Sequence, residues 1–284
     1  MKDILDLEKL HLDKKGIYVS RSLYSGDIAV SKEAWERIHS YNLDDLMRHR
    51  ENFDRDKLED HLSYIKKSYS FTVDTVYLEI GCGPSHIGEY LMKNYGCKFI
   101  GIDFNYEILL TLKRYFELKG YSNYILIHSD INDMPLKDFS VDYIYGGGVI
   151  EHFPDTSHIL KESYRVLEYG GVSFNTVPAL TLWWFLKFYD TIPSIPFLRK
   201  IFELVHIKIL KNKLLLSHSG YQLGFTKKYL INLHKYLGFK NITCGCFAIH
   251  PSKNILSNNT LRGLYFWLQR FSLTAAVYYI EGKK

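Results

Sequence analysis

A short glycine-rich segment contains the first residues whose types and spacing suggest chemistry. Glu79 stands in the apolar stretch Val76–Ile80, which runs directly into Gly81 and Gly83. Glycines between a strand and a helix permit a tight turn and let the backbone approach a ligand, while the helix N-terminus offers free N–H groups. Taken alone, the pattern fits a plain structural turn equally well.

An acidic residue follows at a distance that suits ribose recognition. Asp103 comes directly after a second apolar stretch, Lys98–Ile102, and lies 20 residues beyond Gly83. An acid there can accept hydrogen bonds from ribose hydroxyls, or it can cap the helix that follows. The third glycine of a dinucleotide-binding turn is missing, because His86 occupies that position. The turn therefore disfavours a nicotinamide cofactor.

Alternating strand-like and helix-like stretches must position these residues. Such alternation is typical of βαβ units and a parallel sheet. Near the end, Asn241–Ile249 and Thr274–Ile280 follow each other without a helix-length pattern between them, which predicts a final antiparallel pair. The five earlier strands are expected at Val76–Ile80, Lys98–Ile102, Tyr124–His128, Val141–Tyr145 and Val172–Val177.

The first 70 residues have a different, polar and helix-like character. Ser31 fits the N-cap of a helix over 32–41, and Asp54–Tyr69 has apolar residues at helical spacing. We therefore expect residues 1–70 to form an N-terminal helical extension and residues 71–284 to form the main domain.

Composition bounds the class of protein. The chain has 284 residues, 46% hydrophobic and 24% charged, which is ordinary for a globular protein. It shows neither the apolar core of a signal peptide nor the roughly 20 apolar residues of a spanning helix. A soluble, cytoplasmic protein is expected. The four cysteines are too scattered for a disulfide framework. Cys244 and Cys246 form a single pair where a zinc site wants four ligands, so no metal is expected.

Five segments in order resemble the motifs of the class I S-adenosylmethionine-dependent methyltransferases. In the first motif the family's usual third glycine is replaced by Ser85. The resemblance spans about Thr75 to Ile280, with Pro178–Leu223 poorly matched. The segments are the turn at 79–83, Ser129–Ile131, Val149–Phe153, Arg165–Gly171, and Phe225–Lys227 taken together with Leu237–Phe239.

The resemblance implies both a fold and a cofactor. The implied fold is α/β, a Rossmann-like seven-stranded mostly parallel sheet with its last strand antiparallel and helices on both faces. The implied cofactor is S-adenosyl-L-methionine. Methyl transfer is an in-line displacement that needs chiefly proximity and alignment, so most matching residues would hold the cofactor. These are Glu79 and Asp103 as polar anchors, Gly81 and Gly83 in the turn, Asp130 at the adenine, Phe104 or Ile131 on its ring faces, and Gly147 beside the methionine portion.

Two titratable residues stand where the methyl group should emerge. His152 has an ordinary pKa that suits a general base for a hydroxyl or amine nucleophile, although a histidine at a helix start is as often structural. Glu151 is the alternative base, or the partner that orients the imidazole. His218 could bring a second histidine over the site from the poorly matched segment.

That segment, Pro178–Leu223, is expected to be a helical cap. Its first part is rich in aromatic residues, and a helical apolar stripe with basic flanks follows. Between Pro178 and Lys240 ten lysines and arginines face two acids, a net charge of +8. Three interpretations stay open: a peripheral membrane contact through 179–211, a lid over the site, or a helix buried against the sheet.

The leading functional hypothesis is methyl transfer to a small-molecule acceptor, such as a lipid-linked or sugar metabolite, and the basic cap favours an anionic one. A catalytically silent cofactor-binding subunit and an RNA methyltransferase are the alternatives. No DNA partner is expected, because the chain has neither a recognised nucleic-acid module nor a long basic run. The sequence leaves the acceptor atom and the oligomeric state open.

Overall fold

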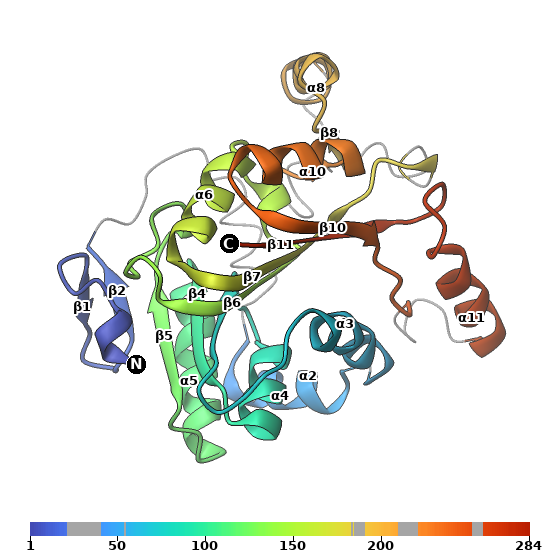
Figure 1. Cartoon of the computed structure of the whole chain (residues 1–284). Helices are drawn as coiled ribbons and strands as arrows, with labels where there is room; N and C mark the ends of the chain where they lie inside the picture. Colours follow the sequence, from blue (N-terminus) through green and yellow to red (C-terminus); the bar gives the residue numbers. More distant parts are fainter. Residues whose placement is uncertain (22–40, 54, 183, 185–190, 210–220, 252–257) are drawn as a thin grey trace.

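One large mixed sheet organises the chain (Figure 1). The computed structural model describes residues 1–21, 41–53, 55–182, 184, 191–209, 221–251 and 258–284. Within these, nine strands hydrogen-bond in the order β1-β2-β5-β4-β3-β6-β7-β11-β10. Their bounds are β1 (Leu10–Leu12), β2 (Tyr18–Ser20), β3 (Val76–Ile80), β4 (Lys98–Asp103), β5 (Tyr124–His128), β6 (Val141–Gly147), β7 (Leu167–Pro178), β10 (Lys240–Cys246) and β11 (Val277–Lys283).

The direction of the strands confirms the mostly parallel sheet. β2, β5, β4, β3, β6 and β7 pair in parallel, and β11 is antiparallel to both β7 and β10. The carboxyl ends of β3, β4, β6, β7 and β10 therefore meet at one edge, where open α/β sheets bind their ligands.

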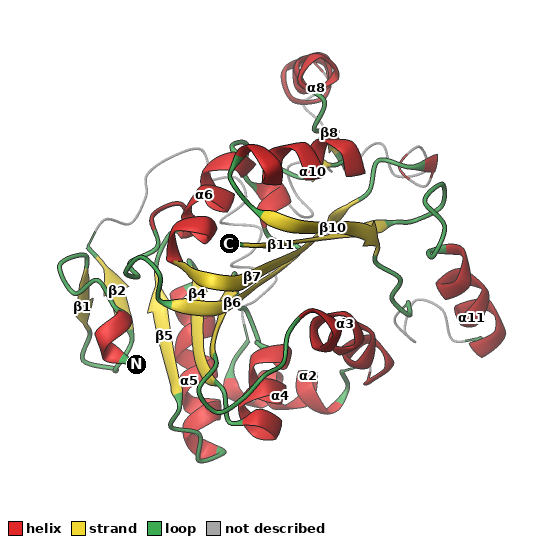
Figure 2. Cartoon of the chain, viewed as in Figure 1, coloured by secondary structure: helices red, strands yellow, loops and turns green. Residues whose placement is uncertain are grey.

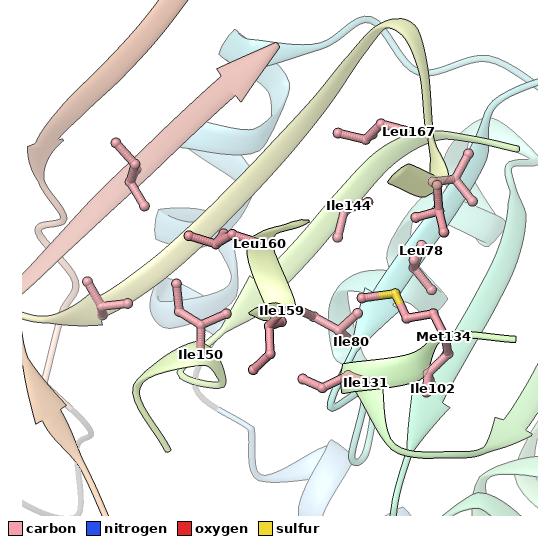
Figure 3. Packing of buried hydrophobic residues seen from close by; sticks show 14 of the residues in the cluster. Leu78, Ile80, Ile102, Ile131, Met134, Ile144, Ile150, Ile159, Leu160 and Leu167 are labelled. Carbon is pink, nitrogen blue, oxygen red and sulfur yellow. The ribbon is translucent and has the colours of Figure 1, made fainter. Parts of the chain in front are cut away.

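Helices cover both faces of this sheet (Figure 2). On one face, α2, α3, α4 and α5 pack against aromatic strand residues such as Tyr77, Phe99 and Tyr143. On the other, α6 and α10 pack on aliphatic residues such as Leu78, Ile80 and Ile144 (Figure 3). The helices are η1 (Lys2–Ile4), α2 (Leu43–Glu51), α3 (Arg55–Ser68), α4 (His86–Tyr95), α5 (Tyr106–Leu118), η2 (Ile131–Asp133), η3 (Ile150–His152), α6 (Thr156–Val166), α8 (Pro196–Phe202), the π-helical η4 (Glu203–Ile209), α10 (Lys227–Tyr236) and α11 (Asn259–Leu268).

The strand count is nine rather than seven, because β1 and β2 come from the region expected to be helical. The loop between them closes on Asp13, whose carboxylate accepts from the backbone N–H groups of Lys15 and Ile17. β2 then extends the sheet by pairing Tyr18 with Ile127 of β5. Three-residue strands are too short to show a period-two pattern, so they were not foreseen. α3 confirms the helix expected over Asp54–Tyr69, whereas the helix expected over 32–41 with its cap at Ser31 lies almost wholly outside the described residues.

A helix also separates the last two strands. α11 lies between β10 and β11, where no helix was expected. Asn258 caps it by accepting from the backbone N–H of Leu261. Its buried residue is Arg262, although Leu261, Leu264 and Trp267 recur at helical spacing, so the side that faces inward is not the apolar one.

The cap region is described in part. Within it, β8 (Ile192–Pro193) pairs in parallel with β9 (Leu223–Gly224), and Ala179 forms a bridge with Phe225. Figure 1 shows α8 standing away from the main sheet. Within the described residues, no helix is both long and apolar enough to cross a membrane.

Candidate cofactor and acceptor site

The glycine turn after β3 has a backbone that only small residues adopt readily. Gly81 and Gly83 have φ angles of 58° and 44°, and Ser85 follows at 46°. A Cβ on Gly81 would lie 2.9 Å from Cγ2 of Val149. The turn therefore passes in direct contact with the loop after β6, and the glycines make this approach sterically possible.

Glu79 lies beneath the turn and fixes the start of α4. Its Oε2 accepts from the Ser85 hydroxyl at 2.8 Å and from the Gly88 backbone N–H at 3.3 Å. Burial raises the pKa of Glu79 to about 7, against the lowering effect of these hydrogen bonds. Its carboxylate therefore holds the turn in place, and it carries a proton for part of the time at neutral pH.

Asp103 is joined directly to the same turn. Its Oδ2 accepts from the Gly83 N–H at 2.8 Å and its Oδ1 from the Asn105 N–H at 2.9 Å. Burial raises the pKa of Asp103 to about 6. The cap of α5 is Asn105, which accepts from two backbone N–H groups, so Asp103 is not needed for capping. Each carboxylate oxygen keeps a further lone pair for a ligand.

Asp130 carries a buried oxygen that lacks a partner. Its Oδ1 accepts from the backbone and side-chain amides of Asn132 at 2.9 Å. Its Oδ2 is buried and has no hydrogen-bond partner among the described residues. Burial raises the pKa of this carboxyl. Buried polar atoms in native proteins are nearly always hydrogen-bonded, so Oδ2 fits a donor from a ligand such as an exocyclic amino group.

The two residues expected beside the adenine ring differ in placement. Phe104 is half-buried, and its carbonyl accepts from Nε2 of His128 at 2.8 Å. Ile131 is 5% exposed and packs in the aliphatic core of the sheet (Figure 3). Phe104 is thus the more accessible of the two.

The glycines at the end of β6 are required by close packing. A Cβ on Gly146 would lie 2.3 Å from Oδ1 of Asn175 on β7, and Gly148 has a φ of 72°. Gly147 is exposed at the last position of β6. A larger residue at Gly146 would displace the Asn175 side chain, so the close packing of the end of β6 against β7 depends on glycine.

Glu151 and His152 follow in η3 with contrasting environments. Burial raises the pKa of Glu151 to about 8, and its Oε2 has no hydrogen-bond partner among the described residues. His152 donates from Nδ1 to the carbonyl of Tyr221 at 2.9 Å. Burial lowers the pKa of His152 to about 4, although hydrogen bonds with the carbonyls of Tyr221 and Gly148 oppose this. The imidazole is therefore neutral at pH 7, and it joins the strand-end loop to the end of the cap.

Arg50 is a site residue that the sequence did not reveal. From α2, its guanidinium donates to the carbonyl of Pro84 and to the carboxylate of Glu89, and it lies 4.2 Å from the centre of the Tyr115 ring. It thereby clamps the glycine turn from outside. No local pattern indicates this role, because its partners are 34 and 39 residues away.

The last residues singled out in the sequence are His218 and the cysteine pair on β10. His218 is outside the described residues. Cys246 contacts Nζ of Lys227 at 3.5 Å, and within the described ranges no group of three or more histidine, cysteine or acidic side chains could hold a metal.

Comparisons with known proteins match this arrangement. Residues 78–174 match the methyltransferase domain family. Demethylmenaquinone methyltransferase from Geobacillus stearothermophilus is 31% identical over 98 residues, 34% of this chain and 42% of that protein. A sterol 24-C-methyltransferase from Aspergillus fumigatus is 27% identical over 113 residues, 39% of this chain and 30% of that protein. The chain spans less than half the length of these relatives.

Solved structures share the fold. Phosphoethanolamine N-methyltransferase 2 from Haemonchus contortus superposes with a TM-score of 0.61 at 15% identity, covering 89% of this chain and 60% of that one. A chain of the complex between the Haloferax volcanii Trm112 activator and a methyltransferase gives 0.57 at 13% identity, covering 89% and 95%.

Together, the sheet order, the glycine turn and the carboxylates at the strand ends define an α/β protein with a nucleotide-type binding edge. The family match makes the class specific. The match over residues 78–174 is to the methyltransferase domain family, and with the shared fold it supports a class I S-adenosylmethionine-dependent methyltransferase.

Proposed function

We propose that this protein transfers a methyl group from S-adenosyl-L-methionine to a small-molecule acceptor. The observation that carries the proposal is the buried, unpartnered Oδ2 of Asp130, which stands in the matched segment one strand beyond Asp103. Asp130 would bind the adenine amino group, Asp103 the ribose, and the turn at Gly81 and Gly83 would admit the remainder. When bound, the cofactor supplies an electrophilic methyl group on a sulfonium.

Calorimetry with S-adenosylmethionine, S-adenosylhomocysteine and NAD tests the cofactor assignment. We expect the first two to bind and NAD to be ignored. Asp130→Asn should weaken binding about 10- to 100-fold, because it replaces the acceptor of a buried hydrogen bond. Asp74→Asn is the matched control, since the Asp74 side chain is 89% exposed. Binding of NAD alone would overturn the proposal.

We further propose that Glu151 takes the proton from the acceptor, with His152 as the alternative base. The unpartnered Oε2 and the pKa of about 8 support Glu151, because a general base works best when its pKa lies near the operating pH. His152 already bonds the carbonyl of Tyr221, which supports a positioning role.

The pH profile of turnover separates the two groups. Glu151→Gln should lower kcat about 10²- to 10⁴-fold. It should also remove the alkaline limb of the profile, in which kcat rises with pH as Glu151 loses its proton. His152→Gln should change kcat less and leave that limb in place. If instead His152→Gln abolishes turnover and Glu151→Gln does not, His152 is the base.

The acceptor is proposed to be a lipid-like or phosphate-bearing small molecule. Relatives over this segment are named for demethylmenaquinone and sterol substrates, and residues 178–240 carry a net charge of +8. A screen of metabolite extracts with labelled cofactor should yield an anionic or lipid-extractable product. A cationic, water-soluble product would contradict this choice.

The membrane contact expected for residues 179–211 stays part of the proposal. In that range α8 has no buried residue, and Phe197 is 74% exposed beside the exposed Lys200. Loss of vesicle binding in Phe197→Gln would support the contact, and unchanged binding would oppose it.

A further inference from the structure

α11 has the reverse of the usual amphipathic arrangement. Its inward face carries Arg262, 4% exposed, and the residue that ends the helix, Gln269, is 2% exposed. Its outward face carries Leu261, Leu264 and Trp267, which are 49%, 51% and 51% exposed. Surface helices of globular proteins normally bury their apolar stripe. An exposed stripe therefore indicates a binding partner that covers it.

Specific hydrogen bonds hold the polar face inward. Arg262 donates from Nε to the carbonyl of Pro251 at 3.1 Å and from Nη2 to Asp56 at 3.2 Å. Gln269 donates to the carbonyl of Ile249 at 2.8 Å. Turning the helix over would take these donors away from the carbonyls of Pro251 and Ile249, and a buried acceptor left unpaired destabilises the folded protein. The outward orientation of the apolar side chains is therefore built in.

The exposed apolar surface continues beyond the helix. Trp267 contacts Phe271 edge-to-face with ring centres 4.7 Å apart, and Phe271 is 47% exposed. Leu273 is 62% exposed, and its carbonyl accepts from the backbone N–H of Leu182, which is itself 51% exposed. We call Leu182, Leu261, Leu264, Trp267, Phe271 and Leu273 the α11 patch.

The α11 patch lies on the segments that leave the ligand edge of the sheet. Strand pairing places Val277 opposite Pro178, and Cys246 opposite Tyr278. The ends of β7 and β10 and the start of β11 are thus level with one another. Both the cap and the segment containing α11 emerge there, at the edge where β6 ends in its glycines. In Figure 1, α11 extends away from this part of the sheet.

The charge around the α11 patch points to an anionic surface. Residues 258–276 contain no acid, and of their two arginines Arg262 is buried and bonded to Asp56, so Arg270 supplies the exposed charge. Arg270 is exposed, with its guanidinium 4.8 Å from the centre of the Phe266 ring. Tryptophan, phenylalanine and leucine beside an unopposed arginine are typical of helices that lie in a membrane interface. In a two-fold contact with a second copy, the two patches would face each other, and residues 258–276 of the second copy would offer Arg270 no acid.

We propose that the α11 patch binds an anionic lipid bilayer surface and thereby places the ligand edge of the sheet beside the membrane. The apolar side chains enter the headgroup boundary, and Arg270 contacts lipid phosphates. A lipid-like acceptor would then reach the site without crossing bulk water. The patch is separate from α8, and Leu182 is the one patch residue that belongs to the segment 178–223.

Vesicle flotation of the full chain, without cofactor or acceptor, tests the proposal. Vesicles of equal parts phosphatidylcholine and phosphatidylglycerol should bind the protein, and binding should fall as salt rises. The double variant Leu264→Gln/Trp267→Gln should reduce partitioning about tenfold or more, because two apolar side chains leave the interface. Leu118→Gln is the matched control, since Leu118 is 68% exposed at the end of α5.

Further measurements make the outcome decisive. Arg270→Gln should reduce binding to anionic vesicles while binding to pure phosphatidylcholine stays low and unchanged. Thermal unfolding should show that all variants keep the wild-type midpoint. Sedimentation that shows a dimer abolished by the double variant, with no flotation of the wild type, would overturn the proposal in favour of a second copy. Flotation equal in wild type and double variant would also overturn it. Because no turnover is measured, either failure leaves the proposed methyl transfer untouched.

Discussion

Replacing Glu151 by glutamine should stabilise the folded protein at alkaline pH. The Glu151 carboxyl is 2% exposed, its Oε2 lacks a partner in the described part of the chain, and burial raises its pKa from 4.5 to about 8. A carboxyl group whose pKa is raised by folding does not destabilise the protein at a pH where it is protonated in both the folded and the unfolded state. The cost appears as pH rises above about 4.5, where the unfolded chain ionises first, and it is complete above about 8.

The size of the effect follows from that rise in pKa. At 1.36 kcal/mol for each pH unit, ionisation of Glu151 in the folded state costs at most about 5 kcal/mol above pH 8. Water entering the opened site lowers this figure, so about 2–4 kcal/mol is expected for Glu151→Gln relative to wild type. At pH 5 the two proteins should differ by less than about 1 kcal/mol.

Urea unfolding at pH 5, 7 and 8.5 measures this difference directly. Glu168→Gln is the control, because Glu168 is exposed in β7 and its replacement should give the same small change at every pH. If Glu151→Gln and wild type keep a constant difference in unfolding free energy from pH 5 to 8.5, the carboxyl is solvated in the folded state and the reasoning fails.

Two further predictions concern the glycine turn. Arg50→Gln should lower the free energy of unfolding by about 1–3 kcal/mol, because it removes charged hydrogen bonds that hold the turn in place. Arg48→Gln on the same helix is the control and should have little effect. Urea titration measures both. Gly81→Ala should lower the melting temperature and weaken cofactor binding, because its Cβ would meet Val149. Gly120→Ala, with positive φ but open space around it, should cost only about 1 kcal/mol; equal losses in the two alanine variants would contradict the steric argument.

The sequence predicted those parts of the fold that are encoded by continuous local patterns. The strands β3 to β6 are short apolar stretches, each followed by turn residues, and the motifs fall at their ends. Asp103 and Asp130 could be singled out because type and position alone mark them. Their hydrogen bonds could not be foreseen, since the link from Asp103 to Gly83 joins two different βα units.

What the sequence did not show depends on distant contacts. β2 exists because β5 offers a free edge, and Arg50 acts on Pro84 and Glu89 from another helix. The apolar residues of α11 recur at helical spacing in the sequence, but their outward orientation could not be predicted, because it is set by the distant partners of Arg262 and Gln269. Each of these features is stabilised by tertiary partners rather than by local preference.

The buried carboxyls of the site lead to a last prediction about cofactor charge. Burial raises the pKa of Asp103 to about 6, of Glu79 to about 7 and of Glu151 to about 8, so the site gains negative charge as pH rises through this range. The sulfur of S-adenosylmethionine is positively charged, whereas the sulfur of S-adenosylhomocysteine is neutral. One unit charge about 10 Å away contributes about 1.7 kcal/mol at an effective dielectric constant of about 20, which corresponds to roughly tenfold in affinity.

The pH dependence of the ratio of the two dissociation constants isolates this effect, because the two ligands differ only in the methyl group on sulfur and the charge that it brings. Affinity for S-adenosylmethionine relative to S-adenosylhomocysteine should rise about tenfold between pH 5.5 and 8.5 and then level off. Glu151→Gln should flatten the upper part of that rise, near its pKa of about 8, while Glu168→Gln should leave the curve unchanged. Calorimetry at several pH values gives both constants. A ratio independent of pH in the wild type would mean that these carboxyls are already ionised at pH 5.5 or lie too far from the sulfur, and the electrostatic account of the site would be wrong.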